Sequence, residues 1–362
     1  MKNKLILLTM FCLFVFSGCS NEIDASFVAT EKKSLVIANW NLQTFFDSQY
    51  DGTEYTGFTS KDKNWTNEKY TNRLERLCSV IEQIDADIIA FEEIENKGII
   101  YDIINHYSIQ GRRDKAYNYA CFTKEENQAF GIALLSRYPI LDYSVHQIDV
   151  RGQRNQTEAN FQEEILEQPR MRPIMKALVQ IGGNKKDENN ISEANKVISV
   201  YVCHWKSKSG GQDESEIWRD FSENQIAHLL SKEQYPFFIT GDFNRDLTEF
   251  NIDKHSKTNG FTGNVRFGHQ YLSISPLEEI SVNSAWLSEE ASQNYKTEGT
   301  YYFQGRWEKL DHFFFGSDIQ LKSFSTVKLE ENTTASGTPY RYSVWDGKGV
   351  SDHLPIVCVL EF

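Results

Sequence analysis

Short apolar runs separated by polar segments recur along the chain from residue 34 onward. Runs of about four to eight residues are typical of buried strands. Two segments, 70–84 and 217–230, instead place apolar residues at helical spacing. Many strands with few helices between them favour two packed sheets with helices outside. The predicted strands are 34–39, 87–91, 117–122, 130–136, 174–181, 197–204, 237–240, 310–315 and 356–362.

The polar segments 48–65, 151–170 and 183–195 are predicted to be loops or insertions. The sequence shows no internal repeat, no low-complexity tract and no linker near its middle. A chain of 362 residues is long enough for one large two-sheet domain or for two ordinary domains. Because nothing divides it, we expect one domain over 34–362.

The N-terminus has the pattern of an export signal. Lys2 and Lys4 precede an apolar run over 5–16 that is too short to span a bilayer comfortably. The run ends in Phe16-Ser17-Gly18-Cys19, which resembles a bacterial lipobox, although such boxes usually carry Leu where Phe16 stands.

We therefore expect a signal peptide over 1–18, lipidation of Cys19 and a polar tether over 19–33. The protein would then be exported and anchored to a membrane by its lipid, in the periplasm or at the cell surface. An ordinary signal peptide and an uncleaved anchor are the alternatives.

Net charge limits the kinds of partner. Lys and Arg number 38 against 51 Asp and Glu, a formal charge of −13, so no global positive field exists to hold a polyanion. Removal of 1–18 would take away two Lys and no acids, which gives 36 − 51 = −15.

The remaining cysteines form no C-x-x-C pair, so buried thiols are expected rather than a zinc site. They are Cys78, Cys121, Cys203 and Cys358.

Polar residues stand at the ends of several predicted strands. If those strands lie in two packed sheets whose ends meet at one rim, their side chains converge there. The residues concerned are Asn41, Glu93, His204, Asp242, Asn244, Asp311, Asp352 and His353.

This order of motifs resembles the endonuclease/exonuclease/phosphatase superfamily, which includes the deoxyribonuclease I type. The resemblance spans 34–362 and implies a four-layered α/β sandwich of two mostly antiparallel sheets flanked by helices. One motif alone is weak evidence, whereas seven in order are strong. They are Asn39-Trp40-Asn41, Phe91-Glu92-Glu93-Ile94, Leu135-Ser136-Arg137-Tyr138-Pro139-Ile140, His204-Trp205-Lys206-Ser207, Gly241-Asp242-Phe243-Asn244, Leu310-Asp311-His312-Phe313 and Ser351-Asp352-His353-Leu354-Pro355.

The resemblance implies a phosphoester hydrolase that uses Mg²⁺ or Mn²⁺, ions that prefer hard oxygen ligands. Glu93 matches the principal metal carboxylate, and Asn41 and Asp352 assist directly or through water. Glu92 stands where many relatives carry Gln, which would add negative charge beside the site.

The same resemblance assigns the proton chemistry. His353 matches the catalytic His that activates water, and Asp311 orients its ring. Asp242 would position the water or help to deprotonate it, and Asn244 would donate a hydrogen bond to a phosphate oxygen. His204 would neutralise the phosphate as an imidazolium or protonate the leaving oxygen. We assign His312 to solvent or packing, because strand alternation points it to the other face.

Arg172 and Lys206 are the candidate substrate-binding residues, with Arg170 and Lys208 nearby in sequence. A solvated charged loop explains them equally well. Trp205, Tyr301, Tyr302 and Trp307 are candidates for base stacking, with sheet core as the alternative.

Fold and catalytic residues do not name the substrate. The leading hypothesis is a nuclease-like phosphodiesterase of endonuclease type that acts as a monomer on nucleic acid. A phosphatase or diesterase acting on inositol-phosphate or phospholipid headgroups is the second hypothesis, because the lipid anchor would place the domain at a membrane. A non-catalytic surface binding protein is the third.

Overall fold

The computed structural model describes the chain from residue 34 to residue 361 with gaps, within a compact unit that runs from Lys33 to Phe362. The predictions for the signal peptide, Cys19 and the tether fall outside the described residues. So do most of the predicted insertions at 151–170 and 183–195. The described residues are 34–59, 64–109, 115–148, 169–181, 196–209, 211–255, 260–269, 279–289, 291 and 298–361.

The first sheet has six strands in the order β15-β16-β1-β2-β4-β3. Strands β1 and β2 are parallel, and every other neighbouring pair is antiparallel. The strands are β1 (Ser34–Phe45), β2 (Ile88–Ile94), β3 (Tyr119–Thr123), β4 (Gly131–Ser136), β15 (Gln320–Thr326) and β16 (Ile356–Glu361).

The second sheet has eight strands in the order β5-β6-β7-β8-β14-β11-β10-β9, and only β7 and β8 are parallel among them. A separate two-stranded ribbon is formed by β12 (Tyr301–Phe303) and β13 (Arg306–Glu308). The sheet strands are β5 (Ile140–His146), β6 (Ile174–Ile181), β7 (Lys196–His204), β8 (Phe237–Asp242), β9 (Asn251–Asp253), β10 (Asn264–Phe267), β11 (Ile280–Ser284) and β14 (Asp311–Phe315).

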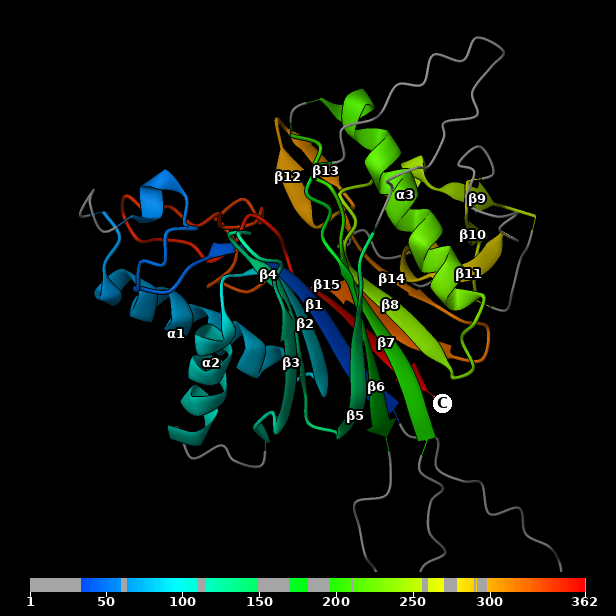
Figure 1. Cartoon of the computed structure of the whole chain (residues 1–362), viewed down its shortest axis with the longest axis horizontal. Helices are drawn as coiled ribbons and strands as arrows, with labels where there is room; N and C mark the ends of the chain where they lie inside the picture. The colour runs from blue at the N-terminus through cyan, green and yellow to red at the C-terminus, as the bar shows by residue number, and fades with distance from the viewer. Residues whose placement is uncertain are drawn as a thin grey trace, which may run out of the picture. The chain divides into compact units, whose positions relative to one another are not determined.

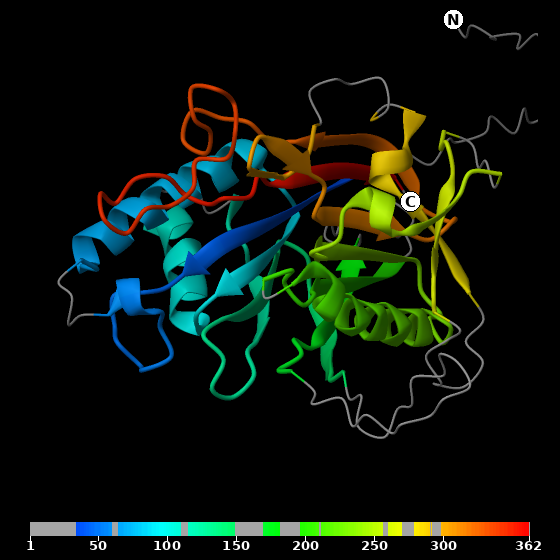
Figure 2. The same ribbon diagram turned by 90° about the horizontal axis from the view of Figure 1, so that it is seen from above.

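Helices cover the outer face of each sheet (Figures 1 and 2). Helices α1 (Asn67–Ile84) and α2 (Lys97–Ile109) lie on the first sheet, and α3 (Gln212–Leu230) lies on the second. Thr66 caps the start of α1, and Asp85 ends it in the left-handed conformation. Short 3-10 turns occur at Thr56–Phe58, Leu247–Glu249 and Ala285–Leu287.

Strand alternation divides the apolar side chains among three cores. In β1, Leu35 and Ile37 point between the sheets, whereas Ala38 and Trp40 point toward α1 and α2. In β14, Phe313 packs between the sheets and its neighbours on the other face pack toward α3. The three cores separate four layers, and the predicted sandwich of two mostly antiparallel sheets flanked by helices is confirmed.

Among the described residues, no helix combines the length and the apolar character that a bilayer crossing requires. The four cysteines after the tether are buried, as expected, and Cys78, Cys121 and Cys203 are free thiols.

Candidate active site

The carboxyl ends of the two parallel strand pairs lie at the same rim of the sandwich. Asn41 lies in β1, His204 ends β7, and Asp242 ends β8 directly opposite His204 in the strand register. Strand β14 runs antiparallel to β8 and places Asp311 opposite Asp242. The predicted convergence of these strand ends is therefore present in the structure.

Glu93 reaches the rim through a local break in β2. The pairing of β2 with β4 shifts register between Glu92 and Ile94, and Glu93 itself has a φ of 61°. A positive φ is strained for a residue with a side chain, and a bulge of this kind re-aims the side chain. One carboxylate oxygen, Oε2, accepts a 2.6 Å hydrogen bond from the Thr44 amide. The other, Oε1, lies 3.7 Å from His204 Nε2.

Asp242 lies at the centre of the polar cluster. Its Oδ2 is 3.7 Å from His204 Nε2 and accepts a 2.9 Å hydrogen bond from Asn41 Nδ2. Asn244 donates to both oxygens, from its backbone amide at 2.8 Å and from Nδ2 at 3.1 Å. Burial raises the pKa of the Asp242 carboxyl to about 7, while His353 opposes and Asp311 adds to that shift. A carboxyl with this pKa is suited to exchange a proton near neutral pH.

The glycine before Asp242 is required by the packing of the two parallel strands. Gly241 has a φ of 144°, and a Cβ there would meet the Cys203 carbonyl oxygen of β7 at 1.9 Å. Any side chain at 241 would force β8 away from β7 and would displace Asp242 from His204.

His353 and Asp311 form the pair that the sequence predicted. Nδ1 of His353 lies 2.7 Å from Oδ2 of Asp311, and both side chains are buried. Burial opposes the charged ring, but Asp311, Asp242 and Asp352 outweigh it and raise the pKa of His353 well above its usual range. The Tyr301 ring packs on the imidazole at 4.9 Å between centroids.

Asp352 is held at the edge of the cluster by an arginine that the sequence did not single out. Arg341 Nη2 lies 2.7 Å from Asp352 Oδ2. A pocket opens at this point beside Asp352. Its other lining residues are Tyr301, Tyr302, Phe303, Thr338, Pro339 and Arg341.

The predicted basic residues divide into two groups. Arg172 reaches the site, since its guanidinium lies over Phe130, and Phe130 stacks on His204. Arg172 also donates to the Trp205 carbonyl at 2.7 Å. By contrast, Arg170 is exposed and donates to the Asn127 carbonyl.

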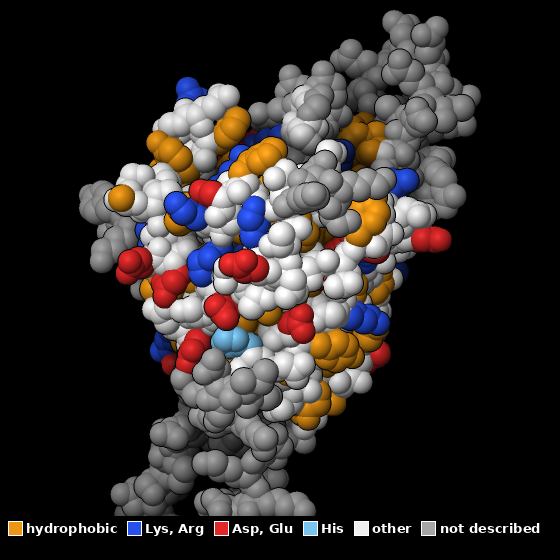
Figure 3. All heavy atoms as spheres, turned by 90° about the vertical axis from the view of Figure 1, so that its left-hand side faces the viewer, with side chains coloured by type: hydrophobic (Ala, Val, Ile, Leu, Met, Phe, Trp, Pro, Cys, Tyr) orange, Lys and Arg blue, Asp and Glu red, His pale blue; other side chains and the backbone are white. Residues whose placement is uncertain are grey.

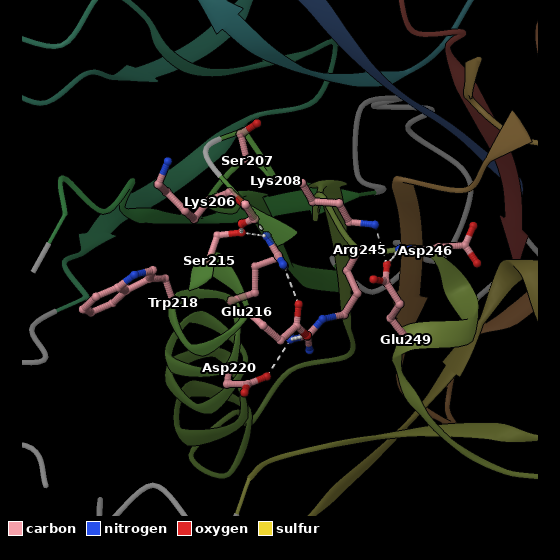
Figure 4. Close-up of polar contacts among 12 residues, drawn as sticks. Lys206, Ser207, Lys208, Ser215, Glu216, Trp218, Asp220, Arg245, Asp246 and Glu249 are labelled. Carbon is pink, nitrogen blue, oxygen red and sulfur yellow. Dashed lines mark hydrogen bonds and ion pairs between the residues drawn. The ribbon is translucent and has the colours of Figure 1, made fainter. Parts of the chain in front are cut away.

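Polar contacts with α3 and with Glu249 hold the segment that follows His204 (Figure 4). Arg219 on α3 donates to the Lys206 carbonyl at 3.1 Å, while Lys208 pairs with Glu249 at 2.7 Å. Burial lowers the pKa of Lys206, and the charges of Arg172 and Arg219 lower it further. Among the described residues, Lys206 has no carboxylate partner, whereas Lys208 pairs with Glu249.

Two expectations require correction. Glu92 is fully buried, and burial with the charges of Asp311 and Asp242 raises its pKa well above the usual range. The structure thus favours an uncharged acid there, in place of the expected added negative charge. Trp205 is 2% exposed and packs on Phe243 with ring centroids 4.6 Å apart, so it belongs to the core and is not available to stack on a base.

His312 is buried and stacks on Phe314, with Nε2 2.9 Å from the Arg245 carbonyl. Its predicted packing role on the other face of β14 is confirmed.

Arg73 is a positioning residue that sequence reasoning missed. It is fully buried on α1 and donates to the carbonyls of Leu42, Gln43, Thr44 and Val350. These bonds tie the end of β1 to the segment before Asp352. The available signal was its place one helical turn from Tyr70 and Leu77, on the face of α1 that is otherwise apolar.

The oxygen donors at the rim fit a small divalent cation. Glu93 Oε1 faces the cluster while Oε2 is held by the Thr44 amide, and Asp352 has its Oδ2 on Arg341. Mg²⁺ and Mn²⁺ accept a few carboxylates and retain several waters, so this sparse set of hard ligands matches them.

The sequence matches the profile of the Endonuclease/Exonuclease/phosphatase family over residues 38–353, and the chain belongs to that family. The match runs through the rim residues from Asn41 to His353. Membership supports a phosphoester hydrolase. None of the curated protein sequences compared with this chain is significantly similar to it.

Solved structures of related fold agree with the four layers. A humanized TDP2 from D. rerio is 12% identical over 91% of this chain and 99% of its own, with a TM-score of 0.51. TDP2 from Caenorhabditis elegans is 13% identical over 91% and 75%, with a TM-score of 0.52. An endonuclease/exonuclease/phosphatase from Beutenbergia cavernae is 13% identical over 91% and 72%, with a TM-score of 0.50. At these identities the likeness concerns the fold alone.

Proposed function

We propose that this protein is a divalent-metal-dependent phosphodiesterase of nuclease type. The observation that carries the proposal is the row of charged and polar side chains at the rim. Glu93 and Asp242 each lie 3.7 Å from His204 Nε2. Asp242 stands opposite Asp311 in the β8–β14 register, and Asp311 pairs with His353 at 2.7 Å. A phosphodiester is an unreactive anion, and its cleavage requires a water, a proton acceptor and positive charge within reach of one phosphate.

Glu93 would hold the cation, with Asn41 and Asp352 as its partners directly or through water. Bound Mg²⁺ or Mn²⁺ would supply charge neutralisation at the phosphoryl oxygens. Fixation of Glu93 Oε2 by the Thr44 amide leaves Oε1 oriented for this contact.

The remaining residues supply the proton chemistry. Asp242, with a pKa near neutrality, takes the proton of the attacking water. Asn244 holds Asp242 in place, and because its Nδ2 also donates to the Trp205 carbonyl, a bond from Nδ2 to a phosphoryl oxygen would replace one of these contacts. Asp311 favours the charged form of His353, which donates a proton or hydrogen bond to the phosphate from its other ring nitrogen. In this proposal that role replaces the predicted activation of water by His353.

His204 has the opposite electrostatic setting. Burial lowers the pKa of its ring well below the usual range, and the charges of Arg172 and His353 lower it further. The free protein therefore favours a neutral His204, which donates or accepts a hydrogen bond at the phosphate. Arg172, rather than a His204 imidazolium, supplies the fixed positive charge on this side.

The surroundings of Asp352 favour a substrate with a flat group beside the phosphate. Tyr302 and Phe303 are 40% and 50% exposed, and they line the pocket that also contains Tyr301 and Arg341. Exposed aromatic rings next to an arginine suit the stacking of unpaired bases. Arg172, beside Phe130 and His204, and Lys206, two residues after His204, add positive charge near His204.

A long duplex is a poorer match. The chain carries a net charge of −13, and acidic and basic side chains are interspersed on the face that bears α1 and α2 (Figure 3). We therefore expect weak binding of nucleic acid that falls steeply with salt. Tight binding of duplex DNA that is insensitive to salt would contradict this expectation.

A substrate panel tests the proposal. The purified chain is incubated with Mg²⁺ or Mn²⁺ and with single-stranded DNA, duplex DNA, RNA, phosphoinositides or sphingomyelin, each with an EDTA control. We expect cleavage of single-stranded nucleic acid, and its loss in His353→Ala. Preferred cleavage of a lipid substrate would instead support an enzyme that acts on inositol-phosphate or phospholipid headgroups. Inactivity on every phosphoester would favour a non-catalytic surface binding protein.

From the sequence alone we also propose that the domain is a lipoprotein anchored through Cys19. Labelling with a radioactive fatty acid in a bacterial host tests this proposal. Incorporation of label that is lost in Cys19→Ser is the expected result, and equal incorporation in both chains would exclude lipidation at this residue.

A further inference from the structure

Three carboxylates meet outside the rim residues described above. Asp51 and Glu54 belong to the segment between β1 and α1, and Glu95 follows the end of β2. One oxygen from each lies within 4.8 Å of the others. Asp51 is exposed, Glu54 is partly buried and Glu95 is fully buried, so the group extends from the surface into the interior.

Glu95 is the residue that sets this cluster apart from ordinary surface acids. Its relative exposure is 0%, and its Oε2 accepts a 2.7 Å hydrogen bond from the Asp47 amide. Its Oε1 is buried and accepts no hydrogen bond from any described residue. A buried carboxylate oxygen without a donor is costly, because it has lost water and gained nothing in return. Such an atom, on a carboxylate that lies beside two others, needs a cation or a donor to balance it.

The positive charge nearby does not balance the cluster. Among the described residues, the basic side chain in contact with the cluster is Lys124, whose Nζ lies 3.6 Å from Asp51 Oδ2. Three carboxylates and one ammonium leave an excess of two negative charges when all are ionised. A divalent cation would neutralise that excess.

We infer that Asp51, Glu54 and Glu95 bind a second divalent cation, and that Ca²⁺ is the ion that fits. Three protein carboxylates suit Ca²⁺, which takes many oxygen ligands in a flexible geometry, whereas Mg²⁺ usually binds one or two carboxylates and keeps several waters. Waters or backbone carbonyls complete the six to eight oxygens that Ca²⁺ accepts.

The backbone of the loop is already folded around two of the ligands. Glu54 accepts hydrogen bonds from the amides of Asp51 and Gly52 at 2.7 and 2.8 Å, while Asp51 accepts from the Thr53 amide at 2.8 Å. These bonds fix the carboxylates before an ion arrives, which reduces the ordering that binding must impose.

The inferred site lies apart from the rim cluster but connects to it through aromatic rings. Tyr55 follows Glu54, is 50% exposed, and packs edge-on against Phe130 at 6.0 Å between centroids. Phe130 in turn stacks on His204. A cation that joins the loop to Glu95 therefore fixes the position of Tyr55 beside the active site. The inference concerns a site beyond the proposed phosphodiesterase centre and does not depend on it.

Calcium binding is measured by isothermal titration calorimetry on the full chain carrying Glu93→Gln, which removes the principal ligand expected at the rim. We expect one Ca²⁺ per chain. Adding Asp51→Asn or Glu95→Gln weakens binding by about tenfold or more, because each removes a charged ligand. Glu126→Gln removes an exposed carboxylate outside the cluster and serves as the matched control, with unchanged affinity.

Asp51 is exposed, so its substitution leaves the fold intact even where Glu95→Gln does not. Equal Ca²⁺ affinity in Glu93→Gln with and without Asp51→Asn would overturn the inference, as would the absence of Ca²⁺ binding at millimolar concentration. Binding of Mn²⁺ without Ca²⁺ would overturn the assignment of the ion. Because all chains carry Glu93→Gln, none of these results depends on whether the rim cluster is catalytic.

Discussion

Replacement of Arg245 by Met tests the buried ion pairs that this arginine makes with three acidic residues of α3. Arg245 directly follows Asn244 and is 1% exposed on its side chain. It contacts Glu216, Asp220 and Glu223, whose side chains are 35%, 7% and 1% exposed. Met fills a similar volume without charge. Arg245→Met therefore removes the arginine partner of two buried carboxylates, Asp220 and Glu223, and of the partly exposed Glu216.

Removal of one partner from a buried ion pair costs about 3–5 kcal/mol. Most of that loss comes from Glu223 and Asp220, because solvent screens Glu216. His269 moderates the loss, since its Nε2 lies 3.0 Å from Asp220 and 3.2 Å from Glu223. Burial opposes its charged form, but both acids outweigh that effect and raise the pKa of His269. The loss should therefore be smaller at pH 6, below that raised pKa, than at a pH above it.

Urea denaturation at both pH values measures the free energy of unfolding. Lys322→Met, which breaks the partly exposed pair with Glu361, is the control and should cost less than about 1 kcal/mol. Glu223→Gln combined with Arg245→Met should recover part of the loss, because it removes one stranded charge. A loss in Arg245→Met no larger than in Lys322→Met would refute the reasoning.

Three further substitutions have defined outcomes. Burial raises the pKa of Glu92, so the free energy of unfolding of the wild type falls as the pH rises from about 4.5 toward that raised pKa. Over this range, urea denaturation with EDTA should show Glu92→Gln becoming more stable relative to the wild type by up to about 1.4 kcal/mol per pH unit. Asp311→Asn should lower kcat by about 10²–10⁴-fold and lower the pKa of His353, read by NMR titration of its ring; an unchanged ring pKa would contradict the pairing. Arg73→Met should cost about 3 kcal/mol or more and release the end of β1, seen as faster hydrogen exchange at Thr44, whereas unchanged exchange would rule out this positioning role.

The sequence was informative where burial and strand order coincide. Buried positions recur along Ile174–Ile181, mostly at every second residue. The apolar pattern of this run therefore predicted both ends of β6 correctly. By contrast, β5 is exposed along most of Ile140–His146 and carries no apolar run that would reveal it. Its strand state comes from pairing with β6, which is a tertiary effect. Helix α2 was missed because its isoleucines also suit a buried strand.

The site residues likewise include some that the sequence could predict and some that it could not. His353 and Asp311 could be paired in advance because both belong to motifs that resemble those of a known family. Arg341 could not, since its partner Asp352 lies 11 residues away across a turn. The positive φ of Glu93, which aims its carboxylate at the rim, could not be predicted either, because it arises from the bulge in the pairing of β2 with β4.

The most direct test of the central claim is the rate of hydrolysis of bis(p-nitrophenyl) phosphate, a minimal diester that needs no binding pocket. The rate is measured with Mn²⁺, with EDTA, and in Glu93→Gln and His353→Ala, with Glu126→Gln as the control. The account predicts Mn²⁺-dependent hydrolysis that EDTA abolishes and that each rim substitution reduces by about 10²-fold or more, with no effect of the control. Hydrolysis that persists in EDTA and in both rim variants would contradict a metal-dependent site at this rim.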